Sequence, residues 1–378
     1  MKINDFKLEC YFEKYEFTAP YLLTQSDCES MTTKELLAYE PGSEEGFMDQ
    51  WLGYTETWGD PQLRAEVARL YKTMGPENIL IFHGAQEAIF DYMNVILDEG
   101  DHMIAQFPNY QSAYEVANTI ADCGYSKWKI RDDGEKWVLD FDELESLVKP
   151  NTKLIAINTP NNPTGYTLTN SQIKRLCDIC KKHDLYLFSD EVYKGLELDG
   201  EKRDWVADHY DKAVSLGVLS KSYGLSGLRV GWLAAKDTKL LAKLNRFKNY
   251  LSICDAAPSE YLAKIAVRHT DELNARSTGI IRANKKIADA FFKKYDYLFE
   301  VKSLSCGPVT FHKLLIDMPV KEFCQMAVDK KGILLMPSAI YDFEGQYFRF
   351  GYGRKNMPEA LAKFEEFLIE EGFTKQKR

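Results

Sequence analysis

The chain has 378 residues, 45% of them hydrophobic and 28% charged, which is typical of a globular protein with a large core. Its formal net charge of −9 argues against a nucleic-acid-binding surface, no apolar stretch is long enough to span a bilayer, and residues 1–7 lack the apolar core of a secretory signal. These features predict a cytoplasmic protein of two domains, with no nucleic-acid or membrane partner.

The eight cysteines are scattered without the spacing of a disulfide framework, so we expect reduced thiols. One pair, Cys177 and Cys180, has the spacing of a redox motif or of half a zinc site. The segment around this pair has helical periodicity, and the pair shares one helix face with Ile173 and Leu176. Since no second Cys or His pair stands nearby, both cysteines are predicted to lie in the core.

Strands and helices alternate through the middle of the chain. Residues 1–40 are aromatic-rich and predicted to be irregular apart from a short helix at 32–37, and Asp60 and Pro61 begin a helix that ends near residue 72. From residue 79 onward, apolar runs predict strands at 79–82, 102–107, 153–158, 185–189, 213–219 and 230–235. Helices are predicted at 84–97, from Tyr110 to Ala121, and at 169–183 with Thr169 or Asn170 as the cap.

This alternation predicts an α/β fold, with a mostly parallel sheet covered by helices on both faces. Ligands of such sheets bind outside the carboxyl ends of the strands. Polar or small residues follow five of the predicted strands, namely Gly84, Tyr110, Asn162, Asp190 and Lys221. We therefore expect a site at this edge of the sheet.

A smaller α+β domain is predicted toward the C-terminus. The chain becomes helical after residue 237, with a long amphipathic helix at 271–295, and then alternates strands at 309–315, 333–336 and 347–350 with two helices, the last at 358–371. We expect residues 1–45 to pack with the small domain at 271–378, residues 46–270 to form the large, ligand-binding domain, and the long helix to join the two.

Two of the strand-end residues suit covalent and acid–base chemistry. Lys221 follows a buried strand, where a desolvated amine can lose its proton and act as a nucleophile, although the segment alone equally suits a lysine that has reached solvent. Asp190 also ends a buried strand, where an ordinary turn or cap role is the alternative.

The order of these motifs resembles that of the fold-type-I pyridoxal-phosphate enzymes, and within them the class I/II aminotransferases. The matching motifs extend from Tyr54 to Arg349 and comprise Gly84-Ala85-Gln86, Tyr110, Asn162-Pro163-Thr164-Gly165, Asp190-x-x-Tyr193, Ser220-Lys221 and Arg229. The resemblance implies pyridoxal 5′-phosphate as the cofactor, with amino acids and 2-oxo acids as substrates.

The resemblance also implies roles for the catalytic residues. Lys221 would form an aldimine with the cofactor aldehyde and later carry the Cα proton, and Asp190 would keep the pyridine nitrogen protonated. Asn162 and Tyr193 would bond the phenolate oxygen. Tyr110 would stack on the ring, a role for which a core aromatic is the alternative.

Further residues would hold the phosphate and the substrate. Gly84, Ala85 and Gln86 at a helix start, with Arg229 and Ser220, would bind the phosphate. Val218 stands where the family often has a serine, so this contact is missing unless Ser222 or water supplies it. Arg349, together with Asn162, would bind the substrate carboxylate, with a surface arginine as the alternative. Tyr54 would reach the phosphate of a neighbouring subunit, which predicts a homodimer.

The resemblance therefore predicts an aminotransferase that moves an amino group between an L-amino acid and a 2-oxo acid. A carbon–sulfur lyase or a cyclising enzyme on the same scaffold is the alternative, because the segment expected to cover the substrate, residues 22–28, lacks the usual glycine. A non-catalytic ligand-sensing module is disfavoured, because the chain is acidic and the fold is expected to begin almost at the first residue.

Overall fold

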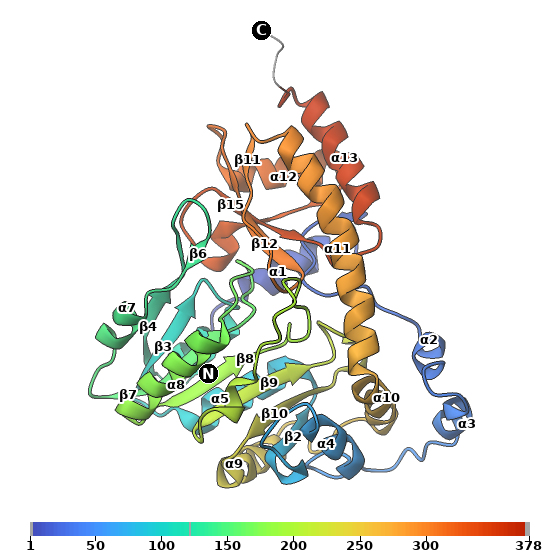
Figure 1. Ribbon diagram of the computed structural model, residues 1–378, viewed down its shortest axis with the longest axis vertical. Coiled ribbons are helices and arrows are strands. Elements are labelled where there is room, and N and C mark those ends of the chain that lie inside the picture. The colour runs from blue at the N-terminus through green and yellow to red at the C-terminus, as the bar shows by residue number, and fades with distance from the viewer. Residues whose placement is uncertain (1–2, 121, 375–378) are drawn as a thin grey trace.

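A seven-stranded sheet forms the base of the molecule in this computed structural model, which describes residues 3–120 and 122–374 (Figure 1). Strands β9, β8, β7, β3 and β4 are parallel neighbours, whereas β10 runs antiparallel to both β2 and β9. The predicted mostly parallel sheet is therefore confirmed. Its strands, in spatial order, are β2 (Ile79–Phe82), β10 (Gly231–Ala235), β9 (Ala213–Val218), β8 (Tyr186–Asp190), β7 (Thr152–Asn158), β3 (His102–Phe107) and β4 (Gly124–Lys129).

Helices cover both faces of this sheet, as predicted. Side chains alternate along a strand, so the two faces of β2 belong to different core clusters. Leu80 and Phe82 pack in a cluster with a first group of helices on one face, and Ile79 and Ile81 pack in a cluster with α4 and α10 on the opposite face. The first group is α5 (Gly84–Ile96), α6 (Ser112–Ile120) and α9 (Thr238–Lys248), and the opposite face carries α4 (Pro61–Ala68), α7 (Phe141–Ser146), α8 (Asn170–His183) and α10 (Ala257–Arg268). Ala121, the predicted end of one helix, lies outside the described residues.

Helix α8 has the cap and the buried face expected of it. The Thr169 hydroxyl accepts a hydrogen bond from the backbone N–H of Gln172, and the Gln172 side chain accepts one from the backbone N–H of Thr169. Cys177 and Cys180 are both fully buried in a hydrophobic cluster with Ile173. The prediction that these cysteines belong to the core is confirmed.

A second, antiparallel sheet and three helices form the upper part of the molecule (Figure 1). The predicted strand at 333–336 is two short strands, of which one joins this sheet and the other, β13 (Ile333–Leu334), does not. Helix α11 runs from α10, beside the large sheet, to α13. The elements are β11 (Phe299–Glu300), β12 (Val309–Leu314), β15 (Tyr347–Gly351), β14 (Met336–Pro337), α11 (Thr270–Lys294), α12 (Val320–Lys331) and α13 (Met357–Glu370).

The N-terminal segment is more regular than predicted. It forms helix α1 (Lys7–Tyr15), which buries Leu8, Phe12 and Tyr15 at helical spacing, so the prediction of irregular structure there is wrong. Strand β1 (Tyr21–Leu22) pairs in parallel with β13, which supports the grouping of residues 1–45 with the C-terminal part. The domain boundaries themselves stay predictions. Two short helices follow, α2 (Thr33–Leu37) and α3 (Ser43–Met48).

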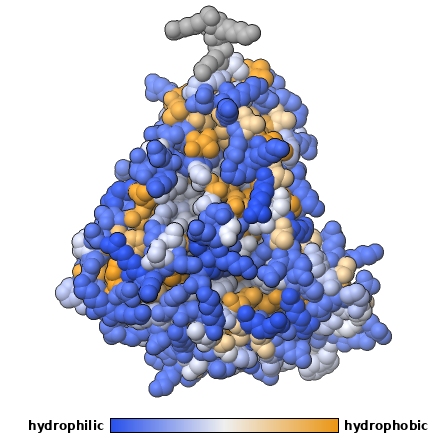
Figure 2. Space-filling view, in the orientation of Figure 1, coloured by the Kyte–Doolittle hydropathy of each residue, from blue (hydrophilic) through white to orange (hydrophobic). Residues whose placement is uncertain are grey.

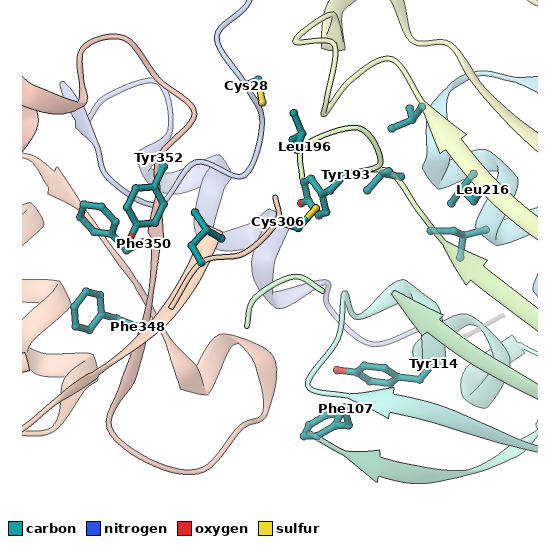
Figure 3. Close-up of a cluster of buried hydrophobic side chains, with 14 of the residues drawn as sticks. Cys28, Phe107, Tyr114, Tyr193, Leu196, Leu216, Cys306, Phe348, Phe350 and Tyr352 are labelled. Carbon is teal, nitrogen blue, oxygen red and sulfur yellow. The ribbon is translucent and has the colours of Figure 1, made fainter. Parts of the chain in front are cut away.

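One continuous core joins the two parts of the chain. Figure 3 shows Tyr193 and Leu196, which follow β8, beside Cys306 and between the strands of the large sheet and the side chains of Phe348 and Phe350 on β15. The face seen in Figure 2 is mainly hydrophilic, with scattered hydrophobic areas. Among the described residues, no helix combines the length and apolar character that crossing a membrane requires.

A buried lysine fixes the backbone at the carboxyl end of β2. Lys248, at the end of α9, is fully buried, and its ammonium donates to the carbonyl oxygens of Ile81 at 2.8 Å and Thr57 at 3.1 Å. The third partner is the Asp255 carboxylate at 2.7 Å. All three ammonium hydrogens therefore have acceptors, which offsets the cost of burying the charge.

Replacing Lys248 by Met should lower the free energy of unfolding by about 3 kcal/mol or more, because it leaves the Asp255 carboxylate buried beside two unpaired carbonyl groups. Urea denaturation followed by circular dichroism, at one protein concentration, would measure the loss. Lys239→Met on the exposed face of α9 is the matched control. A Lys248→Met protein as stable as this control would contradict the prediction.

Candidate active site

A cavity of about 360 Å³ lies at the carboxyl edge of the large sheet. Ten of the site residues predicted from the sequence line it: Ala85, Gln86, Tyr110, Asn162, Asp190, Tyr193, Ser220, Lys221, Arg229 and Arg349. A larger cavity of about 580 Å³ lies near Lys194 and Trp205, but none of the predicted site residues lines it. We therefore assign the candidate site to the smaller cavity.

The sheet topology explains this convergence. Parallel strands β3, β7, β8 and β9 have their carboxyl ends at one edge, and each is followed there by a predicted site residue. Strand β10 runs the opposite way, so Arg229, which precedes it, reaches the same edge. Arg349 comes from β15 of the second sheet, and the cavity therefore lies between the two sheets.

The amine of Lys221 lies inside the cavity rather than in solvent. Its Nζ is 3.2 Å from the Ser26 hydroxyl, and Lys221 forms no ion pair with the residues that the structure describes. Burial lowers the pKa of this amine, and the nearby Asp27 carboxylate only partly opposes the shift. A lowered pKa favours the neutral amine, which is the nucleophilic form.

Asp190 combines a local and a cavity-facing role. Its carboxylate accepts a hydrogen bond from the backbone N–H of Val192 at 3.2 Å, and its backbone carbonyl accepts one from the Asn158 amide at 3.0 Å. Burial raises the pKa of the Asp190 carboxyl to about 7. The Asp190 carboxyl thus takes part in a turn, which was the alternative role considered for it. It is also a buried acid, and a cationic group in the cavity would favour its ionised form.

Arg349 is fully buried, and one of its N–H donor groups is unpaired in the described part of the chain. Its Nε donates to the Thr24 carbonyl at 2.9 Å, and its Nη1 donates to the Asn162 amide oxygen at 2.9 Å and to the Tyr341 hydroxyl at 2.6 Å. The buried Nη2 has no hydrogen-bond partner among the described residues. A buried guanidinium with a free N–H group is a good partner for a carboxylate in the cavity, and the alternative of a surface arginine is wrong.

The start of α5 and Arg229 form a cradle that suits a phosphate dianion. Gly84 has a φ of +79°, and a Cβ there would lie 2.6 Å from Nη2 of Arg229, so only glycine allows this approach. The Arg229 Nη1 lies 3.3 Å from the Ser220 hydroxyl. The residue before the helix, His83, makes no side-chain cap, which leaves N–H groups of the first turn for an anion.

The two predicted ring-binding tyrosines also border the cavity. The Tyr110 hydroxyl donates to Glu9 at 2.7 Å, and its ring packs 4.8 Å from that of Phe6. Tyr193 is almost fully buried, and burial raises the pKa of its phenol. A protonated phenol is a hydrogen-bond donor, as an anionic ligand oxygen requires.

Two sequence-based expectations find no place in this cavity. Ser222, suggested as a substitute for the serine absent at Val218, has its hydroxyl 2.7 Å from the Lys194 carbonyl and 3.0 Å from that of Val192, and it lines the other cavity. That suggestion is wrong, although Ser226 does line the site. Tyr54 is 85% exposed on the single chain and lies outside the cavity.

The N-terminal segment contributes residues that sequence reasoning missed. Thr24 and Ser26 are buried and bond Arg349 and Lys221, so the glycine-free segment 22–28 is held in place against the site. Glu9 and Phe12 of α1 also line the cavity. The amphipathic spacing of Leu8, Phe12 and Tyr15 could have revealed α1, but no signal in the sequence points Thr24 or Ser26 toward the site.

Known proteins of similar sequence agree with this geometry. Capreomycidine synthase of Streptomyces vinaceus is 26% identical over 96% of this chain and 93% of its own length. An aspartate aminotransferase of Sulfurisphaera tokodaii is 24% identical over 86% of this chain and 84% of its own length. The crystal structure of a PLP-dependent aminotransferase from Streptococcus suis superposes with a TM-score of 0.92 at 28% identity, covering both chains completely.

The family of the chain follows from a match over most of its length. Residues 22–364 match the family described as aminotransferase class I and II, and this range includes each of the site residues predicted from the sequence. The chain belongs to the family of class I and II aminotransferases.

Proposed function

We propose that this protein is a pyridoxal-phosphate-dependent aminotransferase that moves an amino group between an L-amino acid and a 2-oxo acid. The observation that carries the proposal is the presence, in one cavity, of a buried arginine with a free donor, a desolvated lysine and a buried acid: Arg349, Lys221 and Asp190. Membership of the aminotransferase family supports it.

The residues that line the cavity fit pyridoxal phosphate. The cradle of Gly84, Ser220 and Arg229 would take the phosphate, and Asp190 would face the ring nitrogen. Tyr193 and Asn162 would bond the phenolate oxygen, and Tyr110 would lie against the ring. When bound, the cofactor supplies an electron sink for the negative charge that develops at the substrate Cα.

The chain's own residues would then do three things. Arg349 binds the α-carboxylate through its free Nη2 and orients the Cα–H bond. Lys221, whose lowered pKa favours the neutral amine, would accept the proton that leaves the substrate Cα, hold it and later release it. Asp190 would keep the ring nitrogen of the cofactor protonated, and a positive neighbour of this kind would favour the ionised carboxylate despite its burial.

A carbon–sulfur lyase or cyclising enzyme is the second candidate, since the same three residues would serve it. It is supported by a relative named as a synthase, capreomycidine synthase, which is 26% identical to this chain, against 24% for the aspartate aminotransferase. The fate of the amino group separates the candidates: a transaminase retains it on the cofactor, a lyase releases it as ammonia, and a cyclising enzyme leaves it in the product.

We further propose a cytoplasmic homodimer. Large apolar side chains of residues 48–54 and 250–253 are exposed, Tyr54 and Tyr250 by 85% and 90%. A hydrogen bond of 2.9 Å from the Thr55 hydroxyl to the Asp255 carbonyl joins the chain just beyond each segment, which supports one shared apolar surface. A second copy of the chain would cover it and would bring Tyr54 toward the neighbouring site.

The purified holoenzyme, mixed with single L-amino acids, should convert the cofactor to its amino form without release of ammonia. Lys221→Ala should lose turnover by about a thousandfold or more while keeping the circular dichroism spectrum of the folded protein, because no other lysine of residues 3–120 and 122–374 lines the cavity. Absorbance spectra and an ammonia assay measure both results. Ammonia and pyruvate from cysteine, with no amino form, would favour the lyase, and normal turnover by Lys221→Ala would refute the role of this lysine.

Arg349→Lys should raise KM for amino acids by about tenfold or more, because a lysine cannot keep the bonds to Thr24, Asn162 and Tyr341 while offering a donor to the carboxylate. Steady-state kinetics with an amino acid and its carboxylate-free amine would test this. The difference in KM between the amino acid and the amine should be smaller in the variant than in the wild type. An unchanged KM for the amino acid would contradict the proposed contact between Arg349 and the α-carboxylate.

Mixing two inactive variants tests the shared site. If Tyr54 serves the neighbouring subunit, co-refolded Lys221→Ala and Tyr54→Ala chains should recover about a quarter of the wild-type activity, because half of the dimers carry one intact site out of two. Each variant alone is the control. If Tyr54 served its own subunit, or the protein were monomeric, mixing would restore nothing.

A further inference from the structure

One face of helix α1 forms a wall of the proposed active site. Leu8, Glu9, Phe12 and Glu16 all line the cavity, and the spacing of Glu9, Phe12 and Glu16 places them along one side of the helix. Phe12 contacts the substrate end of the cavity, since its ring lies 5.6 Å from the guanidinium carbon of Arg349. The two glutamates therefore lie one turn of α1 on either side of Phe12, Glu9 exposed and Glu16 half-buried.

Neither glutamate pairs with a cation among the residues that the structure describes. Glu9 accepts a hydrogen bond from the Tyr110 hydroxyl at 2.7 Å, and Glu16 accepts one from the Gln25 amide at 3.0 Å. Within residues 3–120 and 122–374, neither forms a salt bridge. A third carboxylate of the cavity, that of Asp27, is paired at 2.8 Å with Arg354.

Under the proposed function, the cationic residues of the cavity bind other groups and do not pair with Glu9 or Glu16. Arg229 belongs to the phosphate cradle, Arg349 takes the α-carboxylate, and Lys221 is the catalytic amine. No further lysine or arginine in the described part of the chain lines the cavity, so a side-chain carboxylate of a substrate would meet Glu9 and Glu16 without a counter-charge. A substrate with a positive side chain would meet two acceptors instead.

We propose that Glu9 and Glu16 select amino acids with a cationic side chain, an ammonium or a guanidinium. The inference rests on the proposed function, because it takes Arg349 as the anchor of the α-carboxylate. Arg349 is fully buried and its Nη2 is unpartnered in the same cavity, which fixes one end of the substrate. The other end then extends past Phe12 toward carboxylates that form charge-assisted hydrogen bonds with cationic donors.

The test compares L-lysine, L-ornithine and L-arginine with L-norleucine and L-glutamate as amino donors for the wild-type holoenzyme. We expect a basic amino acid to have the highest kcat/KM. In the double variant Glu9→Gln and Glu16→Gln, the ratio of kcat/KM for the basic donor to that for norleucine should fall about tenfold or more, since glutamine keeps the shape and loses the charge. Glu13→Gln, exposed on α1 and outside the cavity, is the matched control.

A binding measurement accompanies the kinetics. Titration of the cofactor absorbance should show weaker binding of the basic amino acid to the double variant and unaltered binding to the Glu13→Gln protein. Preference for norleucine or glutamate in the wild type, or an equal ratio in the double variant and the control, would overturn this inference while the proposed transamination stands. If no amino acid altered the cofactor spectrum, the proposed function and this inference would fail together.

Discussion

The buried guanidinium of Arg349 is the interaction on which the site depends. It joins three separate parts of the chain, because its partners are Thr24 in the N-terminal segment, Asn162 after β7 and Tyr341 near β14, while Arg349 itself lies on β15. Burying a charge is costly unless it is fully hydrogen-bonded. The unpartnered Nη2 leaves that requirement unmet in the chain alone, and a bound carboxylate would complete it.

Burial shifts the pKa values of Lys221 and Asp190 in opposite directions, yet it favours the neutral form of both groups. It lowers the pKa of the Lys221 amine and raises the pKa of the Asp190 carboxyl to about 7. The inner part of the cavity, around Lys221 and Asp190, therefore disfavours isolated charges of either sign, unlike its rim at α1, where Glu9 is exposed. A ligand with an anionic phosphate, a protonatable ring nitrogen and a carboxylate would bring compensating charges to Arg229, Asp190 and Arg349 respectively.

Most of the large sheet was predictable, since its central strands are continuous apolar runs and its site residues follow them directly. Strand β4 was missed because it lies at the edge, where Ser126, Lys127 and Lys129 interrupt the apolar pattern. The antiparallel direction of β10 carries no local signal, although it is what brings Arg229 to the site. Contacts of Thr24, Ser26 and Tyr341 depend on how distant segments pack, which spacing in the sequence does not encode.

The fully buried ammonium of Lys248 connects two segments of the chain in addition to stabilising the fold. It binds the carbonyl of Ile81, three residues before the glycine of the phosphate cradle, and the carbonyl of Thr57, three residues after the exposed Tyr54. One side chain on α9 thus sets the position of a segment that faces the chain's own cavity and of a segment that faces outward. Substitutions in the buried face of α9 would therefore shift both segments together, so this helix links the position of the cavity edge to that of an exposed surface.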